Sequence, residues 1–251
     1  MIWLRSIAFN LWFYGVTVLV ALLSLPVLLL HPRAARWVTR FWARLVLGGL
    51  RPICGISVVV TGRENLPLQG PALIASQHQS AFDTIIWFLL VPEAAYVLKK
   101  ELGAIPIYGA LSRKMGMIAV DRAAGAAAIR TLVKDAHRAV AAGQQIVIFP
   151  EGTRAAPGVV LPLHPGVAAL ASRTALPVIP VVTDSGSCWG RRAFRKMPGT
   201  IRVAILPPLP AGLPRAELMT RLAALFAAPI PVDNSVGAAP AGFTGESRKA
   251  G

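Results

Sequence analysis

The chain has 251 residues, of which 55% are apolar and 15% charged, and its mean hydropathy is +0.58. Soluble domains average about 45–50% apolar and about 25% charged residues, so the composition indicates that part of this chain contacts lipid. A net charge of +15 favours a polyanionic partner such as nucleic acid, an anionic membrane surface or a phosphorylated substrate.

An uncharged apolar run covers residues 6–30 and is long enough to cross a bilayer core of about 30 Å. A cleaved signal peptide is the alternative, but its apolar region is typically about 7–15 residues long and ends at a small-residue cleavage site. This run is longer, begins with aromatic residues and lacks an A-x-A site, so a retained anchor is predicted. Pro26 lies inside the run and allows a kinked or re-entrant helix.

Four arginines after the apolar run recur every three or four residues and form one stripe of a predicted helix: Arg33, Arg36, Arg40 and Arg44. Trp and Phe side chains share the remaining surface, which favours a helix lying in the headgroup region of a membrane. A helix packed on the core with a solvated Arg face is the alternative. Because only Arg5 precedes the run, the positive-inside tendency predicts that the rest of the chain is cytoplasmic.

From about residue 56 the sequence is typical of a mixed α/β domain whose sheet is covered on both faces. The predicted strands are residues 56–62, 71–76, 94–98, 116–120, 145–150, 176–183 and 201–208. The predicted helices are residues 83–90, 123–142, 166–172 and 215–227. The chain is therefore divided into a membrane anchor with a basic interfacial helix at 1–54, one mixed-sheet domain flanked by helices at 55–229, and a disordered tail at 230–251.

His78 and Asp83 follow the second predicted strand. An imidazole becomes an effective general base when a carboxylate fixes its tautomer and stabilises the imidazolium. Spacing alone leaves a second interpretation open, in which Asp83 caps the next helix and His78 is a satisfied polar residue at a strand end. Ser80 lacks the G-x-S-x-G elbow of an exposed nucleophile and is interpreted as a turn residue.

The segment FPEGTR directly follows QIVI and shares its first two residues with the fifth predicted strand. Glu151, Gly152 and Thr153 are typical of a sharp turn that faces a polar ligand, and Arg154 offers a guanidinium fork that matches phosphate oxygens. Two structural interpretations stay open: Pro150 and Gly152 are ordinary turn formers, and Glu151 could pair with Arg154.

Further cations lie near strand ends. Lys100 and Arg122 fall where an α/β sheet presents its ligand groups, and with Arg154 they could form a cationic pocket for a phosphomonoester. Cys54 and Cys188 have no CxxC spacing, so neither a zinc site nor a disulfide framework is indicated, and a reducing compartment fits.

Together these segments resemble the four ordered motifs of the glycerolipid acyltransferase family, specifically the bacterial 1-acyl-sn-glycerol-3-phosphate acyltransferases. HQSAFD is similar to the H-x4-D motif, KKEL with the downstream IP-x-x-G and GMIAVDR to the second motif, FPEGTR to the third and LPVIPVV to the fourth. The similarity extends over about residues 58–209. Four motifs in order outweigh the capping interpretation of His78 and Asp83.

The resemblance implies a reaction. His78 would remove the proton from the sn-2 hydroxyl of lysophosphatidate while Asp83 orients the imidazole ring. The hydroxyl would then attack the thioester of acyl-ACP (acyl carrier protein) or acyl-CoA directly, without an acyl-enzyme, and give phosphatidate in phospholipid biosynthesis. Neither a metal nor a bound cofactor is expected. The expected location is the inner membrane, with the acyltransferase domain on its cytoplasmic face.

The resemblance also implies substrate contacts. The expected substrate-binding residues are Lys100, Arg122, Glu151, Gly152, Thr153 and Arg154. The three cations would hold the acceptor phosphate, Glu151 and Gly152 would help to position the glycerol, and Pro177 would shape the acyl-donor side.

The chain departs from relatives at one position, where His164 replaces a Lys that commonly precedes Pro-Gly. A His is only partly charged near neutral pH, and His164 is expected at a helix entrance without a catalytic role. The basic run 189–196 would meet anionic membrane lipid or an acidic carrier protein, or lie in solvent.

Two alternatives remain. The same chemistry on another lysolipid, such as lyso-ornithine lipid, would use the same motifs with a different acceptor. A non-enzymatic protein of the membrane surface or of nucleic acid fits the charge, but no nucleic-acid motif is recognisable and no nucleic-acid partner is expected.

Overall fold

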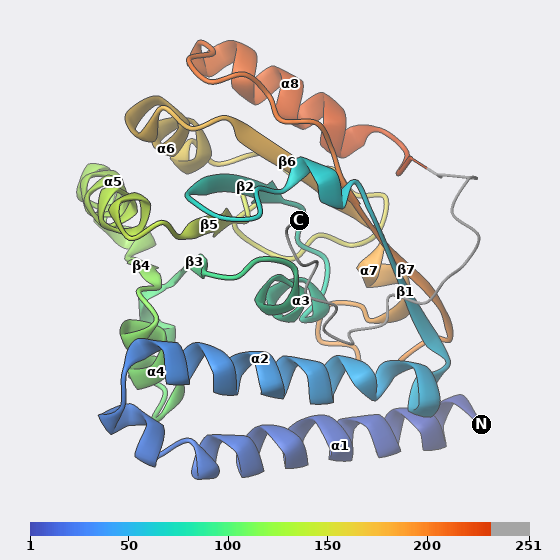
Figure 1. Ribbon diagram of the computed structural model, residues 1–251. Helices are drawn as coiled ribbons and strands as arrows, with labels where there is room; N and C mark the ends of the chain where they lie inside the picture. Colours follow the sequence, from blue (N-terminus) through green and yellow to red (C-terminus); the bar gives the residue numbers. More distant parts are fainter. Residues whose placement is uncertain (232–251) are drawn as a thin grey trace, which may run out of the picture.

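A computed structural model describes residues 1–231, with a seven-stranded sheet at its centre (Figure 1). The strands are β1 Ile56–Thr61, β2 Ala72–Ser76, β3 Ala94–Lys99, β4 Ile118–Val120, β5 Gln145–Ile148, β6 Val178–Thr183 and β7 Gly199–Ile205, in the order β1-β7-β6-β2-β5-β3-β4. Five neighbouring pairs are parallel, and β6 with β7 is antiparallel. The predicted mixed sheet is confirmed; the predicted tail at 230–251 lies outside the described residues except for 230 and 231.

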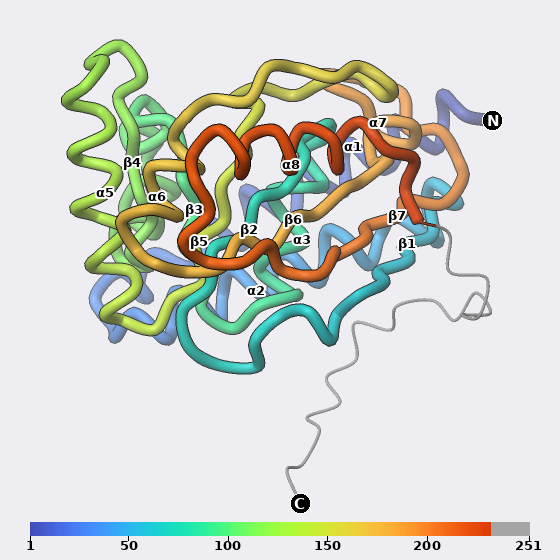
Figure 2. Tube along the Cα trace, turned by 90° about the horizontal axis from the view of Figure 1, so that it is seen from above, coloured from blue at the N-terminus to red at the C-terminus, as the bar shows by residue number. Residues whose placement is uncertain are grey.

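Helices cover both faces of the sheet (Figures 1 and 2). On one face lie α1 Ile2–Leu23, α2 Pro32–Gly48 and α3 Phe82–Leu90, and on the other α5 Ala126–Ala141, α6 Gly166–Thr174 and α8 Arg215–Ala227. The shorter helices are α4 Tyr108–Lys114 and α7 Ser185–Cys188. The four predicted helices correspond to α3, α5, α6 and α8, whereas α4 and α7 are too short for a helical period to reveal them.

The central strand β2 is buried along its whole length because both of its faces are covered. Its side chains alternate between the two cores: Ile74 packs with α2 and α3, whereas Leu73 and Ala75 pack with α5, α6 and α8. This double burial fixes the end of β2, and so the turn that carries His78.

The apolar run at the N-terminus does not form one long helix. Helix α1 ends at Leu23, and a 3-10 turn at Pro26–Leu29 reverses the chain into α2, which lies antiparallel beside α1 (Figure 1). Among the described residues, α1 is the one helix long and apolar enough to cross a membrane. The reversal agrees with the break expected at Pro26.

Helix α2 packs on α3, so one side of it belongs to the protein core. Three arginines of the stripe, Arg36, Arg40 and Arg44, are half-buried, whereas Arg33 is exposed. Arg36 Nε lies 2.6 Å from Glu93 Oε2. Trp37 and Phe41 stack on each other and stay exposed. The helix is therefore packed on the core, as one interpretation predicted, but most of its Arg face is not solvated. Trp42 packs on the core while Trp37 and Phe41 stay exposed, and a place in the headgroup region stays a prediction.

Candidate active site

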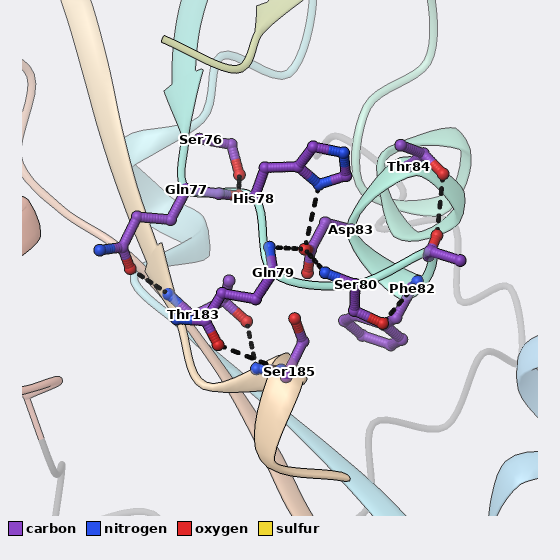
Figure 3. Close-up of polar contacts among 12 residues, drawn as sticks. Ser76, Gln77, His78, Gln79, Ser80, Phe82, Asp83, Thr84, Thr183 and Ser185 are labelled. Atoms are coloured by element: carbon purple, nitrogen blue, oxygen red, sulfur yellow. Dashed lines mark hydrogen bonds and ion pairs between the residues drawn. The ribbon is translucent and has the colours of Figure 1, made fainter. Parts of the chain in front are cut away.

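The turn between β2 and α3 is organised by one carboxylate oxygen (Figure 3). Asp83 Oδ2 accepts hydrogen bonds from the backbone N–H groups of Gln79 and Ser80, each at 2.7 Å. The same oxygen lies 3.3 Å from Nδ1 of His78. Asp83 therefore closes the turn and orients the imidazole at once. It does not cap α3, whose N-cap is Ala81 and has no side-chain capping hydrogen bond.

The imidazole of His78 is held on two sides. Its ring stacks on Phe149, which precedes the EGTR turn, with ring centroids 4.3 Å apart. With Nδ1 directed at Asp83, the neutral ring carries its lone pair on Nε2. The side chain is 13% exposed, so Nε2 is available to a hydroxyl that enters the site.

The backbone of His78 makes two hydrogen bonds with the EGTR turn and the residue that follows it. The N–H of His78 donates to Glu151 Oε2 at 2.6 Å, and the N–H of Ala155 donates to the His78 carbonyl at 2.7 Å. Because β2 and β5 are neighbouring parallel strands, the turns that follow them meet at the same edge of the sheet.

Glu151 is a buried carboxyl group, and among the described residues it makes no ion pair with Arg154. The pKa of Glu151 is raised to about 7, mainly by burial; the hydrogen bond from the N–H of His78 lowers it and the nearby charge of Asp83 raises it. Glu151 therefore changes charge within the physiological pH range.

Arg154 is half-buried close to the His78–Asp83 pair. Burial lowers the pKa of Arg154, the charge of Asp83 raises it, and Arg191 and Arg192 lower it. Its carbonyl oxygen accepts a hydrogen bond from Arg191 Nη1 at 3.4 Å. A guanidinium in this position suits an anion beside the imidazole.

The other two predicted cations form a chain that leads to the same turn. Lys100 Nζ lies 3.2 Å from Asp121 Oδ2, and Arg122 donates a hydrogen bond to the carbonyl oxygen of Gly152. The hydrogen bond from Lys100 lowers the pKa of Asp121. Lys100 is thus linked to the site through its neighbours, with no hydrogen bond to the His78 turn within the described part of the chain.

Two predicted site residues are less involved. Pro177 directly precedes β6, whose Val178 aligns with Leu73 near the start of β2, so Pro177 lies at the opposite edge of the sheet from His78. Thr153 is exposed on the turn. The structure does not bring Pro177 to the His78–Asp83 pair.

Two residues next to the site were not assigned to it from the sequence. Phe149 supports the imidazole, and its place between a buried strand and EGTR was the available signal. His164 precedes α6 as expected, but its ring also lies against Gly152, where an added Cβ would be 2.6 Å from His164 Cδ2. Gly152 has a φ of 65°, so both its conformation and its neighbour require glycine.

The site has the chemistry of one enzyme class, because a carboxylate-oriented imidazole beside a cationic turn can remove a proton from a hydroxyl group. Within residues 1–231 no group of three potential ligands is placed to hold a metal ion. The comparisons with known proteins give the class a family.

A sequence model described as Acyltransferase matches residues 57–184. The 1-acyl-sn-glycerol-3-phosphate acyltransferase of Pseudomonas aeruginosa is 35% identical over 176 residues, which cover 70% of this chain and 68% of the relative. The human 1-acyl-sn-glycerol-3-phosphate acyltransferase alpha is 30% identical over 207 residues, 80% of this chain and 72% of the relative. This chain belongs to the acyltransferase family.

A solved structure supports the fold. The crystal structure of the 1-acyl-sn-glycerophosphate (LPA) acyltransferase, PlsC, from Thermotoga maritima aligns with a TM-score of 0.74 at 23% identity. The alignment covers 90% of this chain and 95% of that structure.

Proposed function

We propose that the enzyme transfers an acyl group from acyl-ACP or acyl-CoA to the sn-2 hydroxyl of 1-acyl-glycerol-3-phosphate and forms phosphatidate. The observation that carries the proposal is the contact of 3.3 Å between His78 Nδ1 and Asp83 Oδ2 beside the EGTR turn. The names of the relatives support the choice of acceptor.

In the proposed reaction, Nε2 of His78 takes the proton of the acceptor hydroxyl as the oxygen attacks the thioester carbonyl. A C–O bond forms, the C–S bond breaks, and the imidazolium returns the proton to the leaving thiolate. Asp83 stabilises the imidazolium between these steps. Proton transfer by a positioned side chain typically accelerates a reaction by about 10²–10⁴-fold. The acyl thioester is a co-substrate, and the reaction needs no bound cofactor or metal.

Among the three predicted cations, Arg154 is best placed for the acceptor phosphate. Lys100 is paired with Asp121 and Arg122 with the Gly152 carbonyl, whereas Arg154 makes no ion pair with a described carboxylate. We assign Lys100 and Arg122 to the rim of the phosphate site. The remaining polar groups of the turn, on Glu151, Gly152 and Thr153, would position the glycerol.

The outer face of α1 is the proposed seat on the membrane. Exposed apolar side chains run along it, including Leu4, Leu11, Val18 and Leu22. Because α1 lies lengthwise against α2 rather than projecting from the domain, the helix would lie in one leaflet of the bilayer. The Arg-rich segment that follows it supports a place on the cytoplasmic face of the inner membrane.

The test offers lysophosphatidate and lyso-ornithine lipid to the purified chain, each with acyl-ACP and with acyl-CoA, and identifies the product. Phosphatidate formation with one donor or both is the expected result. Acylation of lyso-ornithine lipid alone would keep the chemistry and change the acceptor. Absence of acyl transfer to either lipid would refute the proposal.

A further inference from the structure

The segment between α7 and β7 exposes basic side chains and is held in place by one buried lysine. We call residues 189–197 the 189–197 loop. It carries Arg191, Arg192 and Arg195, all exposed, and the sequence has no acidic residue between 185 and 216. The sequence suggested that the whole run faces a partner or solvent; for Lys196 this is wrong, because its side chain is 2% exposed.

Lys196 ties the loop to α1. Its Nζ donates to Asn10 Oδ1 at 3.2 Å and to the carbonyl oxygens of Ala193 and Phe194 at 2.9 and 3.0 Å. Its backbone N–H donates to Ser6 Oγ at 2.9 Å. All these acceptors are neutral, so the buried ammonium is satisfied by the helix and by the loop's own backbone rather than by an ion pair.

Aromatic faces complete the enclosure of this ammonium. Lys196 Nζ lies 5.2 Å from the ring centroid of Trp189 and 5.9 Å from that of Phe9, distances typical of cation–π contacts. Phe9 and Trp189 also meet edge to face. Hydrogen bonds and aromatic contacts therefore join the loop to the first half of α1.

The outer surface of the loop continues the outer surface of α1. Phe194 is 49% exposed, Met197 41% and Trp3 59%. The rings of Trp3 and Phe194 lie 5.9 Å apart, and the guanidinium of Arg195 lies 5.4 Å above Trp3. Exposed aromatic and sulfur side chains edged by arginines are typical of a surface in the headgroup region of a bilayer.

We propose that the 189–197 loop is a second membrane-contact segment that binds the anionic lipid surface beside α1. Phe194 and Met197 would enter the boundary between headgroups and acyl chains, and the arginines would meet lipid phosphates. Charge complementarity and continuity with α1 select this occupant; an acidic carrier protein would explain the arginines but not the apolar side chains. The inference rests on the membrane seat of α1 in the proposed function.

The loop also reaches the active site, since Arg191 Nη1 donates to the carbonyl oxygen of Arg154. A bilayer seated on the loop would thus lie against the turn that holds the proposed phosphate-binding guanidinium. The acceptor could enter the site from the surface on which it resides.

The test compares two charge-matched double variants of the full chain. Arg192→Gln with Arg195→Gln removes two loop charges, and Arg173→Gln with Arg215→Gln removes two exposed charges from α6 and α8 on the far face (Figure 1). Co-sedimentation measures binding to phosphatidylcholine vesicles with and without about 30% phosphatidylglycerol. The loop variant should lose roughly 10- to 30-fold in binding to the anionic vesicles, and the far-face variant less than about twofold.

A second loop variant, Phe194→Ser with Met197→Ser, should bind both vesicle types more weakly, because it removes apolar contacts. Equal binding of wild type and both loop variants would overturn the inference. So would an unchanged vesicle affinity with a raised KM for acyl-ACP, because the loop would then serve a carrier protein.

Acyl transfer in neutral detergent micelles separates this inference from the proposed function. The Phe194→Ser with Met197→Ser variant should turn over lysophosphatidate there like the wild type, because no bilayer is needed. A wild type without turnover in micelles would refute the proposed function, and the vesicle comparison would still decide whether the loop binds lipid.

Discussion

At the residue scale, Asp83 has two tasks that a single substitution can separate. Its Oδ2 closes the turn through two backbone N–H groups and also faces Nδ1 of His78. An asparagine has nearly the same shape and can still accept the backbone bonds, but it cannot stabilise an imidazolium ion.

We therefore expect Asp83→Asn to reduce kcat by about 10²–10⁴-fold, with little change in KM for the acceptor. Steady-state acyl transfer measures both constants, and thermal unfolding controls for damage to the turn. A variant with wild-type kcat would show that Asp83 only closes the turn.

Glu151 gives a prediction about pH. Because burial raises its pKa from 4.5 to about 7, the folded state holds this proton more tightly than the unfolded state. The stabilising contribution of the protonated carboxyl is complete below the unfolded-state pKa of 4.5. It is lost as the pH rises toward the folded-state pKa of about 7. Glu151→Gln does not titrate, so its Tm relative to wild type should increase as the pH rises through this interval.

Thermal unfolding at about pH 5 and about pH 8 tests this prediction, since the other titrating groups are common to both proteins. A Tm difference that is independent of pH would show that Glu151 keeps an ordinary pKa despite its burial.

At the element scale, the site exists because of strand order. The turns after β2 and β5 are far apart in sequence but adjacent in space, and the pairing of β5 with β3 and of β3 with β4 brings Lys100 and Arg122 to the same edge. The EGTR turn contributes most, since it supports the backbone of His78 and carries Arg154.

Arg154→Gln should raise KM for lysophosphatidate by at least about tenfold, because it removes a charge-assisted contact to phosphate. For an acceptor without the phosphate, KM should stay the same. Arg173→Gln, on the exposed side of α6, is the matched control. An unchanged KM for lysophosphatidate would favour a different acceptor.

Local patterns were sufficient for the seven strands and for the helices α3, α5, α6 and α8. Each of these depends on periodicity or on residues close together in sequence. The antiparallel pairing of β7, the stacking of Phe149 on His78 and the burial of Lys196 depend on contacts between distant segments. Lys196 shows most clearly what local sequence patterns do not predict, because nothing in a basic run indicates that α1 will bury one of its lysines.

At the scale of the whole molecule, α1 is joined to the acyltransferase domain and is not a free tether. Phe9 is fully buried in this helix against Trp189, whereas Leu11, two residues later, is 71% exposed. Substitution of Phe9 therefore tests the packing of α1 on the domain, and substitution of Leu11 tests its contact with the membrane.

Phe9→Ala should lower the stability of the chain by about 3–5 kcal/mol, because it leaves a cavity between α1 and the 189–197 loop. Leu11→Ala should leave the stability nearly unchanged and reduce vesicle binding instead. Thermal unfolding and co-sedimentation measure the two effects. Equal, small losses of stability in both variants would show that α1 is not packed on the domain.

The central claim is that His78 is the general base of acyl transfer, and single-turnover transfer to lysophosphatidate by wild type and His78→Ala tests it most directly. The substitution keeps the backbone groups that bind Glu151 and Ala155, so the turn is retained. The account predicts a transfer rate at least about 10²-fold lower with acceptor binding preserved. Transfer by His78→Ala at the wild-type rate would contradict it.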